Sequence, residues 1–239
     1  MTRPLVGFGR GFLAPFGAIS SLWRAPRAWP LALVPVVLLV VVEGAVGLGW
    51  WHYLKAGVSG RLAEHGAFVA GLAAWLVLAL LLVIGWLLVP VLSAPALEGI
   101  VGIIERELAA PERARLGFFA ELGCGMQAML LSLAFTLPLI VGLTLLGLVL
   151  PPLLVVTTPL KLLIGVLGVA WSLFDYPLTL RGVPVAQRLR FMTRHFSAVL
   201  GFGAAFSLLF WLPCLGLLML PVGVAGATRL YWEIRRSTP

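Results

Sequence analysis

Four polar side chains near the amino terminus have the types and spacing needed to bind an oxyanion. Ser20, Ser21, Arg24 and Arg27 lie within eight residues of one another. Guanidinium groups make paired, charge-assisted hydrogen bonds to oxyanions, and backbone N–H groups at a helix start provide further donors. If a helix begins near Ser20, Ser21 and Arg24, then Arg27 can supply bidentate charge to a tetrahedral oxyanion. These four residues are the candidate anion ligands.

Five further charged residues are candidates for a pore or a gate. Glu43 lies about half-way along an otherwise uncharged segment, where a carboxylate should face protein or water because lipid exposure is costly. It either hydrogen bonds in helix packing or acts in a pore. Glu105 and Arg106 belong to a charged helical stretch that is either solvated or lines a vestibule. Arg190 and Arg194 share one helix face, which either anchors the chain on anionic headgroups or forms an electropositive funnel.

No catalytic or metal-binding pattern is found in the sequence. Cys124 and Cys214 lie 90 positions apart in apolar surroundings, which is typical of buried free thiols. His52 and His65 are widely spaced and have no third ligand nearby, so we expect solvated loop residues. No nucleophile with an adjacent base is evident. We expect neither an enzyme nor a bound metal or cofactor.

The composition predicts an all-α integral membrane protein with a single membrane domain over 1–239. Of the 239 residues, 61% are hydrophobic and 11% are charged, and the mean hydropathy is +1.08. Residues 1–30 are basic and amphipathic, which predicts an interfacial helix. Residues 31–51 and 67–92 are each long enough for one transmembrane helix. Ser93–Pro95 is expected to end the second span.

Two later apolar regions predict helical hairpins that enter the membrane only part-way. The segment 196–228 has 33 uncharged residues, too few for two crossings of ~20 residues and a turn. Pro213 and Gly216 interrupt it, so we expect two half-length helices meeting near 212–216. The region 122–174 contains one charge in 53 residues and a doubled proline at 151–152. It allows two full spans or a second, larger hairpin.

The distribution of basic residues predicts that both termini face the cytoplasm. If the amino terminus is inside, cytoplasmic segments hold 14 of the 17 Lys and Arg residues, and the one outside loop, 52–66, holds 2. This asymmetry follows the positive-inside rule. The net charge of +8 does not indicate nucleic acid as a partner, because the basic residues flank apolar spans and lipid headgroups account for them.

Several motifs in the chain resemble one family of membrane proteins. The most specific are Asp175-Tyr-Pro177 and the run LPVGVAGAT over 220–228. Weaker ones are Pro26, Pro35, Ser93-Ala-Pro95 and Gly201-Phe-Gly203. In these motifs the chain resembles the CysZ sulfate permease family, which shares its domain with the etoposide-induced protein of eukaryotes. The resemblance implies two long transmembrane helices plus two partly inserted hairpins, assembled as homo-oligomers.

The activity implied by this resemblance is sulfate uptake across the bacterial inner membrane for cysteine synthesis. In the family's sulfate permeases a Gly-Leu-Arg motif before the first span is associated with the anion. The corresponding stretch here reads Ala25-Pro-Arg-Ala-Trp-Pro30, so the match is not residue for residue. The sequence therefore predicts a channel or permease for sulfate or a related oxyanion. The alternative is a non-transporting membrane scaffold or lipid-organising protein of the same family.

Overall fold

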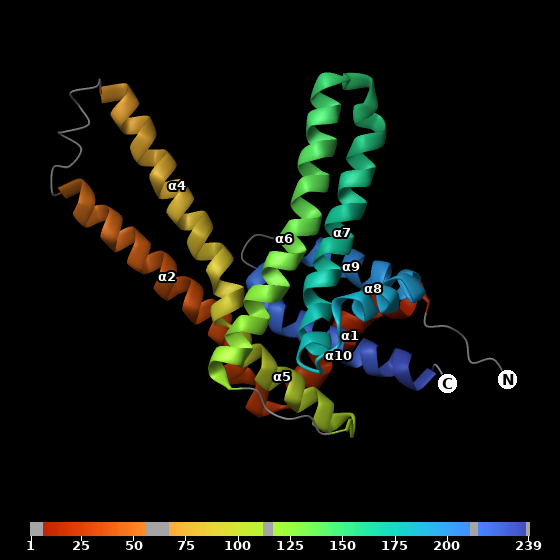
Figure 1. Cartoon of the computed structure of the whole chain (residues 1–239). Helices are drawn as coiled ribbons and strands as arrows, with labels where there is room; N and C mark the ends of the chain where they lie inside the picture. The colour runs from red at the N-terminus through yellow and green to blue at the C-terminus, as the bar shows by residue number, and fades with distance from the viewer. Residues whose placement is uncertain (1–6, 56–66, 112–116, 211–214, 238–239) are drawn as a thin grey trace. The chain divides into compact units, whose positions relative to one another are not determined.

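The structure, a computed structural model, describes residues 7–55, 67–111, 117–210 and 215–237. Within these ranges it contains helices and no strand (Figure 1), which confirms the all-α prediction. The chain forms two compact units, one of residues 33–93 and one of residues 1–32 with 94–239. Four helical segments in the described ranges are long and apolar enough to cross a bilayer. The chain is therefore a multi-pass membrane protein.

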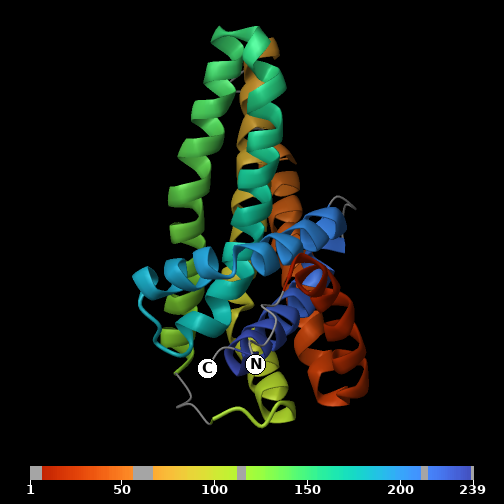
Figure 2. The ribbon, with the colours of Figure 1, turned by 90° about the vertical axis from the view of Figure 1, so that its right-hand side faces the viewer.

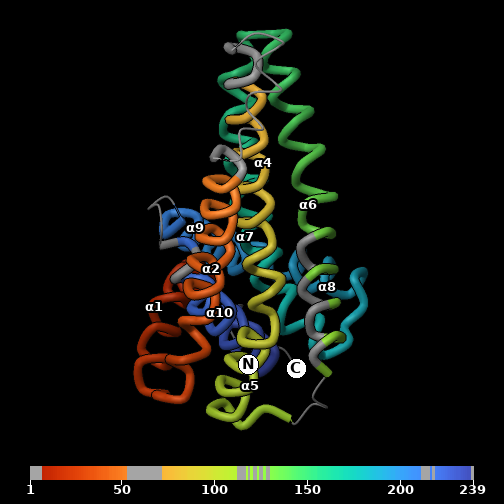
Figure 3. The backbone as a smooth tube through the Cα atoms, turned by 90° about the vertical axis from the view of Figure 1, so that its left-hand side faces the viewer, coloured from red at the N-terminus to blue at the C-terminus, as the bar shows by residue number. Residues whose placement is uncertain are grey.

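The unit of residues 33–93 is built from two long helices, α2 (Trp29–Lys55) and α4 (Ala67–Leu92). At 1.5 Å per residue, each is about 40 Å long and exceeds the ~30 Å hydrocarbon core. Both carry apolar side chains on every face, and they run beside each other (Figure 3). Both predicted long spans are confirmed as helices. Ser93 ends α4 as expected, and its hydroxyl donates to the carbonyl of Val89 at 2.6 Å.

Glu43 faces α4, as predicted for a carboxyl group in the middle of a span. A Cβ placed on Gly85 would lie 2.9 Å from Oε1 of Glu43, so the missing side chain of Gly85 makes room for the carboxyl group. Its Oε2 is buried and has no hydrogen-bond partner among the described residues. The contact agrees with packing against protein, and the pore or gating role of Glu43 stays a prediction.

The core of the other unit joins helices that are distant in sequence. Helix α1 (Phe8–Arg24) packs against α9 (Phe196–Phe210) and α10 (Leu215–Ser237), and α9 and α10 pack against α7 (Leu154–Thr179). Three fully buried rings form its centre, and Phe202 lies 5.1 Å from both Phe174 and Phe206. Glycines bring α1 and α9 into backbone contact. A Cβ on Gly11 would overlap the carbonyl oxygen of Ala198.

Helix α1 has one face in this core and one apolar face outside it. Gly11, Pro15, Ala18, Ser21 and Leu22 are buried at helical spacing. The opposite surface exposes aromatic and aliphatic side chains, namely Phe8, Leu13, Phe16, Ile19 and Trp23. This second face is the one that the predicted interfacial role would place in the lipid.

Two antiparallel helices form the first predicted hairpin. Helix α6 (Phe118–Val149) and α7 (Leu154–Thr179) are joined by a 3₁₀ turn at Pro151–Leu153, and they run side by side in two views (Figures 1 and 2). The sharp turn expected at the doubled proline is confirmed. The helices extend beyond the expected limits of 122 and 174, and both are long enough to cross a bilayer.

A short amphipathic helix, α8 (Val185–Arg194), connects α7 to the second predicted hairpin. The turn before it uses Gly182 at a φ of +65°, a conformation that glycine adopts without strain. Helix α9 has 15 residues, and α10 has 23. Residues 212–214 of the expected hairpin tip, which include Cys214, lie outside the described residues, as does the side chain of Cys124.

Candidate anion-binding site

The turn between α1 and α2 presents Arg27 to solvent. This turn is the 3₁₀ helix η1 (Pro26–Ala28), which follows the last residue of α1 after Ala25. Pro26 fixes φ at the first position of the turn, and Ala28 is fully buried against the core. The indole of Trp29 donates to the carbonyl of Leu22 at 3.2 Å and ties the two sides of the turn together. Arg27 therefore projects from a backbone that is held on both sides.

Helix α5 (Ala94–Glu107) brings a second arginine beside this turn. Its apolar face buries Leu97, Ile100, Val101 and Ile104 at helical spacing, which fixes the rotation of the helix. Gly99 lets the side chain of Leu31 approach α5 closely, since a Cβ on Gly99 would lie 2.8 Å from Cδ1 of Leu31. Arg106 is exposed, and its Nε donates to the carbonyl of Gly102 at 3.1 Å.

Arg27 and Arg106 line one cavity. Its volume is about 420 Å³, and its walls are formed by Ala25, Pro26, Arg27, Ile103 and Arg106. Two guanidinium groups and three apolar side chains thus border a space open to solvent. Guanidinium donors match the geometry of tetrahedral oxyanions. The structure thus brings together a predicted anion ligand and a predicted gating residue from separate parts of the chain.

Three carboxylates of α5 and α10 are paired with other arginines. Glu105 binds Arg181 at 2.8 Å, Glu107 lies 3.9 Å from Arg229, and Glu233 lies 3.5 Å from Arg10. Among the described residues, the guanidinium of Arg27 has no acidic partner, and that of Arg106 bonds only a backbone carbonyl. Both arginines therefore keep donors and net positive charge available for an anion.

The other three predicted anion ligands lie on the last two turns of α1. Ser20 is exposed and donates to the carbonyl of Gly17 at 2.8 Å. Ser21 is buried, donates to the same carbonyl at 3.3 Å and accepts a hydrogen bond from Arg229. Arg24 is exposed and ends the helix. The expectation of a helix start here is wrong, because α1 runs from Phe8 to Arg24 and these residues lie at its carboxyl end.

The predicted basic face of α8 is exposed. Arg190 and Arg194 both point to solvent, and neither has an acidic partner in the part of the chain that the structure describes. The same helix buries a third arginine, Arg188, of which 6% of the side chain is exposed. Its guanidinium pairs with Asp175 at 2.5 Å and also donates to the hydroxyl of Thr179 and the carbonyl of Val183.

Two buried ion pairs were not foreseen from sequence. The first is Asp175 with Arg188. The second is Glu105 with Arg181, whose guanidinium also lies 4.4 Å from the ring centre of Trp232. Only 7% of the side chain of Glu105 is exposed, and its ion pair joins α5 to the turn after α7, while its predicted pore or gating role stays a prediction. The sequence did single out Asp175, because it is the only carboxylate residue between Glu121 and Glu233.

His195, between α8 and α9, predicts a pH dependence of stability. Burial, together with the positive charge of Arg194, lowers the pKa of its imidazole below the usual 6.5. Below about pH 6.5 the unfolded chain therefore takes up a proton that the folded protein resists, and stability falls with further acidification. We expect the thermal unfolding temperature in detergent to be constant above that pH and to decrease below it. The decrease should be smaller in His195→Gln, and identical pH profiles would contradict this assignment.

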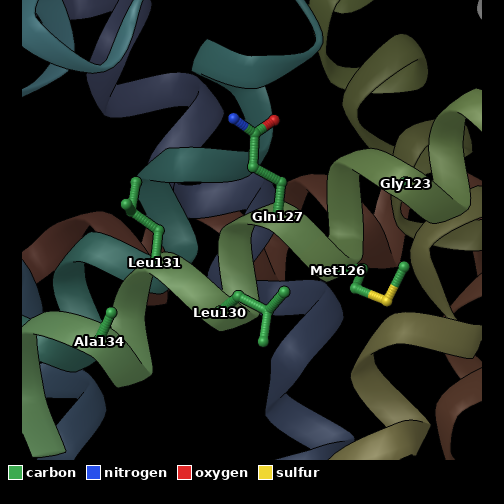
Figure 4. A pocket seen from close by; sticks show the side chains of 6 residues that line it. All are labelled: Gly123, Met126, Gln127, Leu130, Leu131 and Ala134. Carbon is green, nitrogen blue, oxygen red and sulfur yellow. The ribbon is translucent and has the colours of Figure 1, made fainter.

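A second hollow lies along α6 and has a different character. Its described lining residues all come from that helix and include one polar side chain, Gln127 (Figure 4). The volume is about 450 Å³, and the other lining residues are Gly123, Met126, Leu130, Leu131 and Ala134. None of these residues carries a charge, so this groove lacks the chemistry that the cavity at Arg27 offers.

Comparison with known proteins places the chain in a family. A sequence model described as sulfate transporter CysZ/etoposide-induced protein 2.4 matches residues 14–221. The chain belongs to this family. A relative named sulfate transporter CysZ, from Pseudomonas fluorescens, is 34% identical over 106 residues. That match covers 44% of this chain and 42% of the relative, so the chain matches less than half of the relative's length. The family model includes η1, α5 and the cavity between them.

Proposed function

We propose that the protein carries sulfate or a related oxyanion across the bacterial inner membrane, as a channel or permease that supplies sulfur assimilation. The single observation that supports this most is the cavity where Arg27 and Arg106 meet without an acidic partner among the described residues. Sulfate remains a dianion at neutral pH and cannot donate protons, so a site with guanidinium donors suits it. Membership of the family and the name of the relative agree with this substrate class.

Arg27 lies in the stretch that the resemblance associates with the anion. The stretch that corresponds to the family's Gly-Leu-Arg motif, Ala25–Pro30, contains Arg27, although the match is not residue for residue. Pro26 holds the turn rigidly, so Arg27 is presented without the flexibility of glycine. Arg106, from α5, completes the pair of cations.

Helix lengths support a partly inserted second hairpin. Helix α9 has 15 residues and is about 22 Å long, which is shorter than the ~30 Å hydrocarbon core. The uncharged part of α10 ends at Thr228. We propose that 196–228 enters and leaves by one face, with both termini cytoplasmic according to the charge asymmetry. Because irregular backbone inside a membrane must be buried in protein or line a watery cavity, this architecture requires a pore-like interior or an oligomeric core, and the resemblance to the family implies a homo-oligomer.

Transport by the purified full-length protein tests the proposal. In proteoliposomes, radiolabelled sulfate should enter faster than in empty vesicles, and Arg27→Ala should slow uptake about 10-fold or more. The reason is the loss of a charge-assisted hydrogen bond worth about 1.5–3 kcal/mol. Arg106→Ala should have an effect in the same direction. Arg10→Gln is the matched control, because Arg10 and its partner Glu233 do not line the cavity and their exposed pair contributes little.

The alternative function gives a different outcome in the same assay. A scaffold or lipid-organising protein would produce no uptake above that of empty vesicles. That result, with correctly folded protein in the vesicles, would reject transport. Equal uptake by the wild type and by the Arg27→Ala and Arg106→Ala variants would keep transport but reject this site.

A further inference from the structure

Five polar side chains of helix α7 lie on one narrow face. Thr157, Lys161, Ser172, Asp175 and Thr179 lie within about 60° of one another around the helix axis, at 3.6 residues per turn. The rest of the helix is mainly aliphatic and aromatic. Polar side chains inside the membrane are costly in contact with lipid. A partner helix is therefore expected to cover a polar line of this length.

Helix α6 covers this line at three levels. The hydroxyl groups of Ser132 and Ser172 are hydrogen bonded at 2.9 Å. A Cβ on Gly168 would lie 2.9 Å from Oγ1 of Thr136, and one on Gly147 would lie 3.2 Å from Oγ1 of Thr157. The polar face of α7 therefore follows the seam between α6 and α7.

Two buried oxygen atoms on this face have no hydrogen-bond partner among the described residues. Thr157 is 3% exposed, and its Oγ1 is one of them. The other is Oδ2 of Asp175, which is 1% exposed and whose other oxygen binds Arg188. Buried hydroxyl groups normally have a hydrogen-bond partner. The hydroxyl of Thr157 is an exception, with an unused donor directed into the seam.

Lys161 lies one helical turn from Thr157 on this face. It is half-buried, and no ion pair or hydrogen bond joins it to another described residue. It is ten residues from Pro151 at the hairpin tip, or about 15 Å along the helix. Lysines snorkel to headgroups near the ends of spans, but this one is well inside a segment long enough to cross. A cation at that depth is costly without an anion.

We propose that Lys161 and Thr157 form a second anion-binding position inside the membrane, through which the permeating oxyanion passes. This inference rests on the proposed transport function. The ammonium supplies charge, and the Thr157 hydroxyl supplies a hydrogen-bond donor. Conduction favours several weak sites in series over one tight site, and anion pores use Lys or Arg for selectivity. The position would follow the Arg27 cavity on the route of the ion.

Uptake assays on variants of both sites test this position. Lys161→Met should slow sulfate uptake about 10-fold or more, which corresponds to about 1.4 kcal/mol, whereas Lys161→Arg should retain most of it by keeping the charge. Thr157→Val should slow uptake by a smaller factor. Thr158→Val is the matched control, since Thr158 is an exposed neighbour off the polar face. The Lys161→Met variant in detergent should still bind sulfate at Arg27, as measured by calorimetry.

The outcomes separate this inference from the function on which it rests. Normal uptake by Lys161→Met together with impaired uptake by Arg27→Ala would overturn the second position alone. Absence of uptake by the wild type would overturn both proposals. Lys161→Gln provides a polar replacement if Lys161→Met does not elute as a folded protein, and wild-type uptake by that variant would also overturn the inference.

Discussion

Replacing Asp175 with alanine is expected to lower the free energy of unfolding by about 3–5 kcal/mol. The substitution leaves the guanidinium of Arg188 buried, with only the Thr179 hydroxyl and the Val183 carbonyl as partners. An uncompensated buried charge is among the most destabilising defects that one substitution can produce. Reversible denaturation of the full-length protein in detergent, followed by circular dichroism, measures the loss.

The same helix provides the control for this prediction. Arg190→Ala on α8 removes an exposed arginine with no acidic partner in the described residues, so the free energy of unfolding should change by less than about 0.5 kcal/mol. The double variant Asp175→Ala with Arg188→Met should recover part of the loss, because it removes the stranded charge. A double variant less stable than either single variant would show that the pair is not coupled in this way.

Gly11→Ala should destabilise the packing of α1 on α9 by about 3 kcal/mol. A Cβ at this position would overlap the carbonyl group of Ala198, which is backbone and cannot rotate away. Overpacking typically costs 1–3 kcal/mol, and we expect the upper end because whole helices must separate. The thermal unfolding temperature in detergent should fall accordingly.

Gly17→Ala on the same helix is the matched control. No atom lies within 4 Å of a Cβ placed there, so the added methyl group meets open space. Since alanine also favours the helical backbone over glycine, the variant should be as stable as the wild type or slightly more so. Equal losses in the two variants would show that the contact with Ala198 does not explain the effect of Gly11→Ala.

Local sequence rules predicted those parts of the fold that depend on length and on helix-breaking residues. The two long spans, the end of α4 at Ser93 and the turn at Pro151 all follow from apolar run length and proline. The limits of α6 were less accurate, since the helix starts at Phe118. Its first turn contains Glu121, and the prediction had treated charge as the boundary of the membrane segment.

The candidate site was predicted only in part, because its geometry depends on contacts between distant segments. Arg27 and Arg106 are 79 positions apart, and sequence alone does not show that η1 and α5 border one cavity. Ser21 was selected for its hydroxyl, which the fold instead pairs with Arg229. Asp175 and Arg188 are 13 positions apart across a turn, so helical spacing does not relate them. Tertiary packing alone determines which charges are neutralised.

Some arginines pair with carboxylates and others do not, and this difference has a consequence for the surrounding lipid. Arg24, Arg27, Arg190 and Arg194 offer guanidinium groups that no described carboxylate satisfies. A phosphodiester headgroup presents the same oxygen chemistry as a free oxyanion, and anionic leaflets attract basic residues near their surface. Anionic headgroups would then compete with the oxyanion that we propose as substrate. Vesicles rich in zwitterionic phospholipid should reveal tighter apparent affinity than vesicles rich in phosphatidylglycerol.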